Sequence, residues 1–386
     1  MISRARSTAF HVLTRVEAGG WASDLLLVHA ADLDSRDAGL ASEIVYGSLR
    51  HRVQLDYLIR HYSGRDPASL DAPVLVALRI GIYQLRYMDR IPPHAAVGES
   101  VELAKREATR AASGLVNAVL RKVGREPVEW PDRATALSMP EWLLDRWDRQ
   151  FGPEQAERIA RAFLRPAATY VRNPPVDALL ELEPADVPGA FRVVSGDARG
   201  HRIQDVSSQA VVPLLGLELG QTFLDLCAAP GNKTAQALES GVKAVACDLH
   251  LFRLRNVPNG CARVALDATI APPFRTTFDR ILVDAPCSGT GTLSRNPEIR
   301  WQLTPADIRD LHGRQTQILR NALDLLAPEG RLVYSTCSLE TRENEDVVAR
   351  VLKKAEGRFR LESEMRRFPG TDPGDGFYAA VITSTR

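Results

Sequence analysis

The spacing of apolar residues divides the chain into a helical front part and a back part in which short strands alternate with helices. In residues 1 to about 125, apolar side chains recur every three or four positions, as at Ala9, Leu13 and Val16. This is the 3.6-residue period of an amphipathic helix. The front part is therefore predicted to be an all-α helical bundle.

Short apolar runs alternate with helical segments from residue 222 onward. The predicted strands are residues 222–226, 244–247, 263–266, 280–283 and 331–334. The longest predicted helix spans residues 305–326, and residues 377–383 are expected to add an antiparallel edge strand. Strands separated by helices in this way indicate an α/β domain with a doubly wound, mostly parallel, Rossmann-like sheet.

The stretch between these two parts carries weaker signals. Residues 126–140 are polar and rich in proline, which is typical of a linker. Two predicted helices follow, at 141–151 and 154–164, and then two short strand-like runs, at 169–172 and 191–194, which together indicate a small α/β connector. Three domains are therefore predicted: a helical domain at 1–130, a connector at 140–220 and a sheet domain at 221–386.

Composition narrows the class of protein. The 386 residues are 45% hydrophobic and 25% charged, as in ordinary globular proteins. No apolar stretch approaches the roughly 20 residues of a membrane span, and the first residues lack a signal-peptide core, so a soluble cytoplasmic protein is expected. The 49 cationic and 48 acidic residues give a net charge of +1. Charge by itself therefore does not indicate a nucleic-acid partner.

Five cysteines are scattered through the second half of the chain. None belongs to a C-x-x-C pair, and the histidines show no metal-ligand spacing, so neither a metal site nor a disulfide framework is expected. Cys247, on a predicted strand, is interpreted as a packing residue, and so is Cys227 in the loop after the first strand. The five are Cys227, Cys247, Cys261, Cys287 and Cys337.

The first predicted strand runs into a loop of small residues. In a doubly wound sheet this loop faces the ligand crevice, and small side chains let a cofactor approach the backbone. A phosphate-binding P-loop is the alternative, but its glycine spacing is missing here. After Asp225 and Leu226 the loop residues are Cys227, Ala228, Ala229, Pro230, Gly231, Asn232 and Lys233.

Acidic residues follow the next two predicted strands. Asp248 ends the second strand, where acidic residues of nucleotide-binding sheets hold ribose hydroxyls. Asp267 follows the third strand and is a candidate partner for an adenine amino group. The segment between Asp248 and Asp267 is short and contains Pro258 and Gly260, so no full helix is expected there.

Two cysteines follow the ends of the fourth and fifth predicted strands. Cys287 lies in the sequence D-A-P-C-S-G-T-G, which begins at Asp284, and Cys337 lies in S-T-C-S. A lone cysteine is most often a small buried hydrophobic residue. Two of them at neighbouring strand ends, one beside an aspartate, favour a reactive pair instead.

These motifs resemble a known family. D-x-C-A-A-P-G-x-K, D-A-P-C-S-G-T-G and T-C-S are similar to the motifs of the Sun family of RNA 5-methylcytosine methyltransferases, as are Q-D-V-S-S-Q at 204–209 and N-P-E-I-R-W at 296–301. The front part resembles the antitermination factor NusB, through Y-G-S-L-R at 46–50 and G-L-V-N-A-V-L-R at 114–121. The resemblance covers nearly the whole chain. It implies methylation of C5 of a cytosine in small-subunit (16S) ribosomal RNA.

The resemblance implies a role for each of four residues. Cys337 is implied as the nucleophile that adds to C6 of the cytosine, and Cys287 as the residue that assists release of the product. Asp284 is expected to hold the N3 and N4 edge of the flipped-out base, and Lys233 to pair with Asp284. The reverse assignment, with Cys287 as nucleophile, is the arrangement of DNA 5-methylcytosine enzymes and remains an alternative.

The resemblance also implies the cofactor and the partner. S-adenosyl-L-methionine is expected to contact residues 227–233, Asp248, Asp267 and Asp284. The NusB-like domain is expected to bind ribosomal RNA through the basic cluster Arg121, Lys122 and Arg125, in a chain that acts as a monomer. A non-catalytic RNA-binding or ribosome-assembly factor that kept the fold is the alternative function.

Asn232 stands where the family has a second glycine. Asparagine tolerates left-handed backbone better than most residues, so Asn232 is expected to adopt that conformation.

Overall fold

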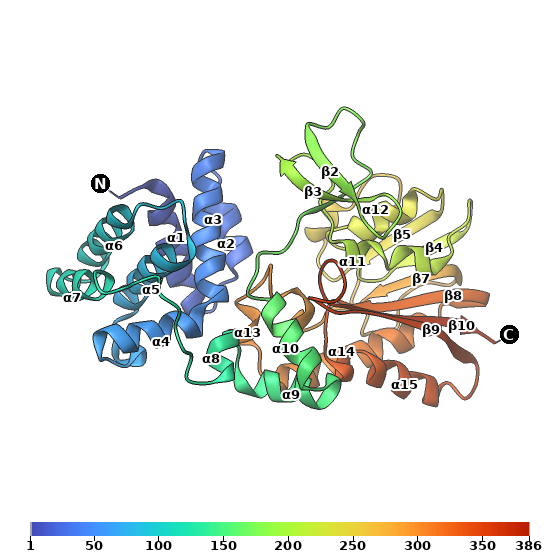
Figure 1. The fold of residues 1–386 in the computed structure, drawn as a ribbon. Helices are drawn as coiled ribbons and strands as arrows, with labels where there is room; N and C mark the ends of the chain where they lie inside the picture. Colours follow the sequence, from blue (N-terminus) through green and yellow to red (C-terminus); the bar gives the residue numbers. More distant parts are fainter. Residues whose placement is uncertain (1, 386) are drawn as a thin grey trace. The chain divides into compact units, whose positions relative to one another are not determined.

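The computed structural model describes residues 2–385, which divide into two compact units (Figure 1). The first comprises Met1–Pro166 and Leu293–Gln302, and the second comprises Ala167–Thr292 and Leu303–Arg386. This division differs from the three predicted ranges, because the predicted connector is shared: its helices belong to the first unit and its strands to the second.

The first unit is helical, as predicted. α5 lies at its centre, in contact with α1, α3, α4, α6 and α7. Because it is surrounded, α5 is apolar on nearly all sides, and Val76, Leu78, Ile80 and Ile82 are all buried. The elements of this unit are α1 (Arg4–Glu17), α2 (Ala22–His29), α3 (Ser35–Arg50), α4 (Arg52–Ser63), η1 (Pro67–Ser69), α5 (Ala72–Tyr87), α6 (Pro93–Glu107), α7 (Arg110–Leu120), α8 (Arg133–Leu137), α9 (Glu141–Phe151), α10 (Pro153–Ala162) and α13 (Ile299–Gln302).

α8 lies within the predicted linker, which is therefore not wholly irregular. The side chain of Asp132 accepts a hydrogen bond from the backbone N–H of Thr135 at 2.6 Å and so caps the helix. Leu137 and Met139 are buried at its end. A helix of five residues is too short for apolar periodicity to reveal. The only local signal for it in the sequence is the capping residue Asp132.

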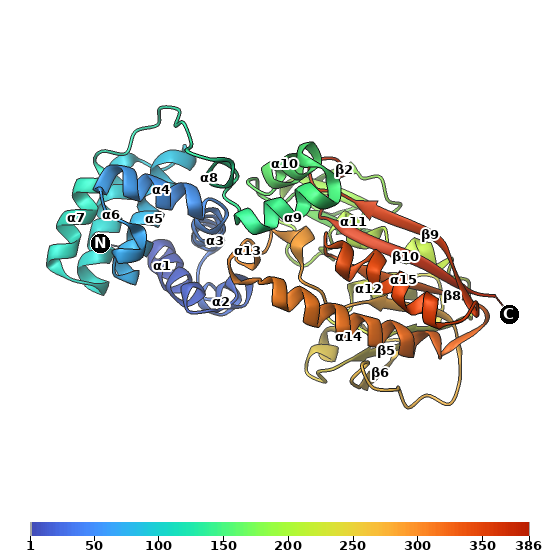
Figure 2. The same cartoon turned by 90° about the horizontal axis from the view of Figure 1, so that it is seen from below.

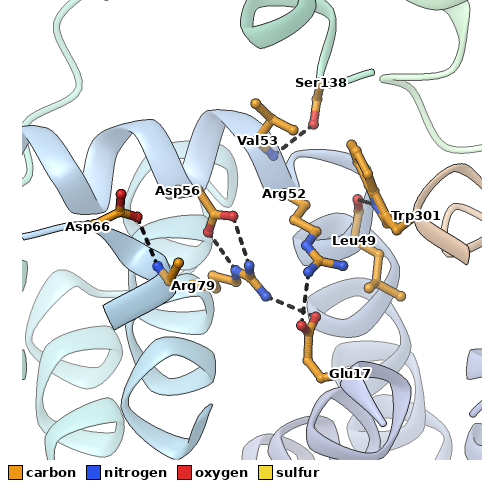
Figure 3. Close-up of polar contacts among 10 residues, drawn as sticks. Glu17, Leu49, Arg52, Val53, Asp56, Asp66, Arg79, Ser138 and Trp301 are labelled. Carbon is orange, nitrogen blue, oxygen red and sulfur yellow. Dashed lines mark hydrogen bonds and ion pairs between the residues drawn. The ribbon is translucent and has the colours of Figure 1, made fainter. Parts of the chain in front are cut away.

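A polar cluster ties three helices of the first unit together (Figure 3). The guanidinium of Arg79 on α5 donates to both carboxylate oxygens of Asp56 on α4, at 2.7 and 2.8 Å, and to Glu17 on α1 at 2.9 Å. Arg52 donates to the same Glu17 at 3.0 Å. Bidentate arginine–carboxylate pairs combine strength with a fixed geometry, so this cluster sets the relative positions of the three helices.

The segment that contains α13 follows β7 in the sequence but packs within the helical unit. Arg300 is 1% exposed, and its two terminal nitrogens each donate to two backbone carbonyls. The Nη1 atom donates to Ser138 at 3.0 Å and Arg50 at 3.4 Å, and Nη2 to Leu293 at 3.1 Å and Phe163 at 3.3 Å.

The neighbouring Trp301 adds a further link to the same unit. Its indole N–H donates to the carbonyl of Leu49 at 3.2 Å (Figure 3). The sequence had assigned this segment to the sheet domain, because nothing in a local pattern indicates which distant helices it contacts.

The second unit contains a seven-stranded sheet of order β6-β5-β4-β7-β8-β10-β9. The strands from β6 to β8 are parallel, whereas β10 is antiparallel to β8 and to β9. The predicted doubly wound α/β sheet is confirmed. Its strands are β4 (Thr222–Asp225), β5 (Lys243–Asp248), β6 (Ala262–Ala265), β7 (Phe278–Asp284), β8 (Leu326–Thr336), β9 (Phe359–Arg367) and β10 (Phe377–Ser384).

The prediction that residues 377–383 form the edge strand is wrong. β10 is antiparallel, as expected, but it lies between β8 and β9, and most of its residues are buried. β9 forms the edge instead. Five of its nine residues are charged and five are exposed, which suits a sheet edge but hides the strand from an apolar pattern.

Helices cover both faces of the sheet. Each face of the sheet has its own hydrophobic core, because alternate residues of a strand point to opposite faces. Leu224 and Tyr334 pack on the side of α14 and α15, whereas Phe223 and Val333 pack on the side of α12. Figure 2 shows α14 and α15 together on one face. The helices are α11 (Val206–Gln209), η2 (Val212–Leu215), α12 (Asn232–Leu238), η3 (Arg253–Asn256), η4 (Thr290–Thr292), α14 (Pro305–Leu323), η5 (Thr341–Glu343) and α15 (Glu345–Lys354).

A small antiparallel sheet of order β1-β3-β2 precedes the large one. Its strands are β1 (Tyr170–Arg172), β2 (Leu180–Pro184) and β3 (Ala190–Gly196). β1 and β3 match the two predicted runs, whereas the glutamate-rich β2 was not predicted. Across residues 2–385, no helix is both long and apolar enough to cross a bilayer.

Candidate active site

The predicted site residues gather at one edge of the sheet. β4 ends at Asp225, β5 at Asp248, β7 at Asp284 and β8 at Thr336. Since β4, β5, β7 and β8 are parallel, their carboxyl ends meet at this edge. From β4 the chain continues to β5 and β6 on one side, and it then returns to β7 on the other side of β4. Such a switch point in the strand order is where doubly wound sheets bind ligands.

The loop after β4 depends on Gly231 rather than on Asn232. Gly231 has φ +108°, and a Cβ atom there would lie 2.7 Å from the Cα atom of Val257. Asn232 is the first residue of α12 and has ordinary helical backbone. The prediction that Asn232 adopts a left-handed conformation is therefore wrong. Its side-chain amide donates to the carbonyl of Ile203 at 3.3 Å. Asparagine is tolerated because the preceding glycine makes the turn.

The side chain of Asp225, at the end of β4, stabilises this loop through hydrogen bonds. It is fully buried, and its carboxylate accepts hydrogen bonds from the Thr234 hydroxyl at 2.7 Å and the backbone N–H of Cys227 at 3.4 Å. Burial raises the pKa of Asp225 to about 7, because the charged carboxylate loses its hydration. Asp225 is therefore a structural carboxyl group that links Cys227, at the start of the loop after β4, to Thr234 on α12.

The raised pKa of Asp225 predicts a pH-dependent stability. The folded chain keeps a proton that the unfolded chain releases near pH 4, so the stabilising contribution is complete below about pH 4 and is lost as the pH rises through 7. We expect Asp225→Asn, which cannot ionise, to gain up to about 4 kcal/mol relative to wild type between pH 4 and pH 8. Urea denaturation at several pH values measures this. A difference that is constant with pH would contradict it.

A cavity of about 870 Å³ opens at the ends of β4, β5 and β7. Five of the predicted cofactor residues line it: Cys227, Ala229, Asp248, Asp267 and Asp284. Ala228, Pro230, Gly231, Asn232 and Lys233 do not line it; they belong to the turn into α12. The loop thus shapes the cavity, but only some of its residues face it.

The acids of the cavity are held in place by neighbouring groups. Asp248 is buried, accepts the backbone N–H of His250 at 3.0 Å and lies 3.7 Å from the guanidinium of Arg253. The backbone N–H and hydroxyl of Thr269 donate to Asp267 at 2.9 and 2.7 Å, and these hydrogen bonds lower the pKa of Asp267. Both carboxylates are thus oriented before any ligand arrives.

Sequence reasoning missed the wall of the cavity that α14 provides. Gly313, Arg314, Gln317 and Ile318 line the cavity from this helix, together with His250 and Arg253 on the segment after β5. Their only sequence signal was the position of a long helix after β7. A helix period does not say which of its faces meets a cavity.

The two predicted cysteines lie side by side. The sulfur atoms of Cys287 and Cys337 are 3.4 Å apart, although the residues are 50 positions apart in the chain. Both residues are half-buried. The hydrogen bond to Cys337 and burial raise the pKa of the Cys287 thiol well above its ordinary value. The raised pKa favours the protonated form of the Cys287 thiol, and either sulfur can be the donor in the contact between the two cysteines.

Lys233 and Asp284 form the expected pair. The Nζ atom of Lys233 lies 2.7 Å from Oδ2 of Asp284, and the Ser335 hydroxyl donates to Oδ1 at 2.8 Å. The ammonium group also lies 5.0 Å from the centre of the Phe377 ring. Because the carboxylate is held through both oxygens, its orientation toward the cavity is set. Within residues 2–385, no cluster of three His, Cys, Asp or Glu side chains is arranged to hold a metal ion.

A sheet of this strand order, with an acid-lined cavity at its switch point, defines a Rossmann-like methyltransferase. Residues 212–383 match the family described as 16S rRNA methyltransferase RsmB/F, and residues 3–125 match the NusB family. The chain belongs to the ribosomal RNA small subunit methyltransferase B family. The Erwinia tasmaniensis protein of that name is 34% identical over 95% of this chain and 95% of its own. The probable Bacillus subtilis enzyme is 32% identical over 89% and 87%, respectively.

Solved structures agree on the fold. The crystal structure of PH0851 covers 100% of this chain and 99% of its own, with a TM-score of 0.79 and 22% identity. A methyltransferase homolog protein from Pyrococcus horikoshii covers 66% of this chain and 100% of its own, with a TM-score of 0.56 and 25% identity. The structural similarity to PH0851 therefore extends over the helical unit as well as the sheet.

Proposed function

We propose that this chain transfers a methyl group from S-adenosyl-L-methionine to C5 of a cytosine in small-subunit (16S) ribosomal RNA, through a covalent bond between Cys337 and C6 of the base. The observation that carries the proposal is the pair of thiols 3.4 Å apart, together with the carboxylate of Asp284, three residues before Cys287, which Lys233 holds. The small-subunit ribosomal RNA named for the relatives supports the choice of substrate.

The cavity fits the cofactor in size and chemistry. A volume of about 870 Å³ lies within the usual range for pockets that bury a small ligand. Asp248 suits the hydroxyls of a ribose, and Asp267 suits the amino group of adenine, because carboxylates accept hydrogen bonds from both. When bound there, S-adenosyl-L-methionine supplies an electrophilic methyl group. The half-buried Cys227 and the apolar Ile318 line the same cavity.

The cysteine pair supplies what cytosine lacks. C5 is a poor nucleophile, but addition of the Cys337 thiolate to C6 converts the ring to an enamine-like form whose C5 is nucleophilic. Free cysteine has a pKa of about 8.5, so the site has to favour the thiolate. The sulfur of Cys287 lies 3.4 Å from that of Cys337, close enough for its thiol to donate a hydrogen bond to a Cys337 thiolate.

Asp284 and Cys287 complete the sequence of steps. Asp284, held at Oδ2 by Lys233, is suited to hydrogen-bond the N3 and N4 edge of a flipped-out cytosine. Once C5 carries the methyl group, its proton must leave so that the C6–sulfur bond breaks and the aromatic ring is restored. Cys287, beside the adduct sulfur, is placed to assist this elimination.

Binding of ribosomal RNA is assigned in part to the helical unit. Arg121 and Lys122, at the end of α7, are exposed. Arg125 is already engaged by the carbonyls of Leu85 and Met88, at 2.9 and 3.2 Å. Arg121 and Lys122 each make one side-chain hydrogen bond, to Asn117 at 3.1 Å and to the carbonyl of Tyr62 at 3.3 Å, and both are exposed. They are therefore the better candidates for phosphate contacts, which position RNA without reading its sequence.

Methyl transfer from labelled S-adenosyl-L-methionine to small-subunit ribosomal RNA tests the proposed function. Nuclease digestion of the product should place the label in 5-methylcytidine. Label in another nucleoside would overturn the choice of base. Absence of transfer, with RNA binding retained, would favour the non-catalytic assembly factor instead.

Asp248→Ala should weaken cofactor binding by about 10- to 100-fold, since each hydrogen bond to a charged group contributes about 1.5–3 kcal/mol. Isothermal calorimetry with S-adenosyl-L-methionine measures the effect. Cys227→Ala is the matched control, because it changes the loop without removing a carboxylate, and it should weaken binding only modestly. Wild-type affinity in Asp248→Ala would contradict the placement of the cofactor.

A further inference from the structure

The loops that carry the two thiols are both tied to one buried carboxylate, that of Glu343. We propose that Glu343 is a positioning residue that holds Cys287 and Cys337 at their working separation. This inference rests on the proposed function, since it assigns a purpose to the 3.4 Å distance between the sulfur atoms. Glu343 does not touch the reacting atoms and acts through the residues that follow the cysteines.

The carboxylate contacts both loops through equivalent residues. Ser288 follows Cys287 directly, and Ser338 follows Cys337. Oε1 of Glu343 accepts the backbone N–H of Ser288 at 2.9 Å, and Oε2 accepts the hydroxyl of Ser338 at 2.5 Å and also the hydroxyl of Ser288. One side chain thus fixes the residue adjacent to each thiol.

Further contacts fix the carboxylate itself. Glu343 is fully buried, and Gln315 on α14 donates to its Oε1 at 2.9 Å and also to the carbonyl of Pro286 at 2.9 Å. The hydroxyl of the buried Tyr334 donates to the backbone carbonyl of Glu343 at 2.6 Å. Side chains held by packing and by such hydrogen bonds keep a functional pair within the narrow geometry that chemistry needs.

The two serine hydroxyls also meet each other. Ser288 Oγ lies 3.1 Å from Ser338 Oγ, and Thr290 Oγ1 lies 3.2 Å from Ser338 Oγ while accepting the backbone N–H of Leu339 at 2.9 Å. These contacts join the loop after β7 to the loop after β8. The carboxylate of Glu343 accepts hydrogen bonds from both loops, so its removal would leave the buried donors of Ser288, Ser338 and Gln315 without this acceptor.

The separation of the thiols can be tested without RNA or cofactor. Diamide oxidises two thiols to a disulfide and is itself reduced to the hydrazine, so the rate of closure in the full chain reports how often the sulfurs meet at bonding distance. Peptide mapping identifies the Cys287–Cys337 disulfide. We expect Glu343→Ala to close it about tenfold or more slowly than wild type, and Glu343→Gln, which keeps the shape and part of the hydrogen bonding, to stay within about threefold.

Glu345→Ala is the matched control. Glu345 is also a glutamate, two residues further along, but it pairs with Arg366 rather than with the cysteine loops. Its removal should leave the rate of disulfide closure unchanged. Cofactor affinity, measured by calorimetry, reports whether Glu343→Ala is folded. If it is not, Ser338→Ala removes one of the ties and should slow closure by about threefold.

The same variants predict a catalytic signature. Glu343→Ala should lower kcat by about tenfold or more with little change in the KM for RNA, and Glu343→Gln should restore most of the rate. Closure at the wild-type rate in Glu343→Ala, or equal slowing by Glu345→Ala, would overturn the assignment. Failure of wild type to methylate cytosine would overturn the proposed function instead, while the diamide result would still report the geometry.

Discussion

Replacing Cys337 by alanine is expected to abolish both methyl transfer and covalent attachment to RNA, whereas replacing Cys287 by alanine is expected to accumulate the attached form. The two variants differ because they interrupt different steps. Without Cys337, no sulfur can add to C6, C5 stays a poor nucleophile, and the rate should fall by about 10⁴-fold or more. Without Cys287, addition and methylation proceed, but elimination is slowed.

The structure gives a reason for this order of roles. The Cys287 thiol lies 3.4 Å from Cys337, and its pKa is raised by the hydrogen bond to that residue and by burial. A thiol that keeps its proton is a poor nucleophile, since the thiolate is the reactive form. The raised pKa of Cys287 therefore supports the proposal that Cys337 is the attacking residue.

Denaturing gel electrophoresis after incubation with RNA and S-adenosyl-L-methionine distinguishes the two variants. Cys287→Ala should show a slowly migrating protein–RNA complex, and Cys337→Ala should show none. Cys247→Ala is the matched control, because Cys247 is a buried free thiol on β5, and it should behave as wild type. If Cys337→Ala instead trapped RNA and Cys287→Ala did not, the roles would be reversed, as in the DNA enzymes.

Replacing Arg300 by methionine is expected to cause the largest loss of stability in the helical unit. The guanidinium is 1% exposed and donates to four backbone carbonyls, so its removal leaves several buried acceptors without partners. Each unsatisfied buried group costs about 1–3 kcal/mol, and the total should reach at least about 3 kcal/mol. Arg300→Lys should be nearly as harmful, because one ammonium group cannot reproduce the planar fork.

Chemical denaturation followed by circular dichroism measures this loss. Arg52→Met is the matched control, since Arg52 lies in the same unit and its guanidinium lies 5.6 Å from the Trp301 ring centre. Its ion pair with Glu17 is partly exposed, so its removal should lower the free energy of unfolding by only about 1 kcal/mol. A loss below about 1 kcal/mol in Arg300→Met would show that the carbonyls find other partners.

Much of the site followed from local sequence because parallel strands place their carboxyl ends together. Once residues 222–226, 280–283 and 331–334 are recognised as neighbouring strands, Cys287 and Cys337 must meet, although 50 residues separate them. The small-residue loop before Lys233 was predicted from its position directly after the first strand. In each case, a pattern of a few residues determines a strand or turn, and the topology of the sheet then brings the residues that follow the strands together at one edge.

Other features were beyond the reach of any local pattern. Gly231 rather than Asn232 makes the turn because the backbone of Val257, 26 positions away, leaves no room for a Cβ atom. β10 is an inner strand only because the charged β9 pairs with its outer side. Apolar periodicity states which face of an element is buried, but not what covers it.

Local sequence was enough to predict the two classes of domain, the strand ends that carry Asp225, Asp248 and Asp284, and the pairing of Cys287 with Cys337, because these depend on short-range periodicity and on motifs of contiguous residues. Only the tertiary structure placed α14 along the cavity, seated Arg300 within the helical unit and brought Glu343 beneath both thiol loops. Buried polar groups must find partners wherever the fold provides them, and those partners lie far away in the chain.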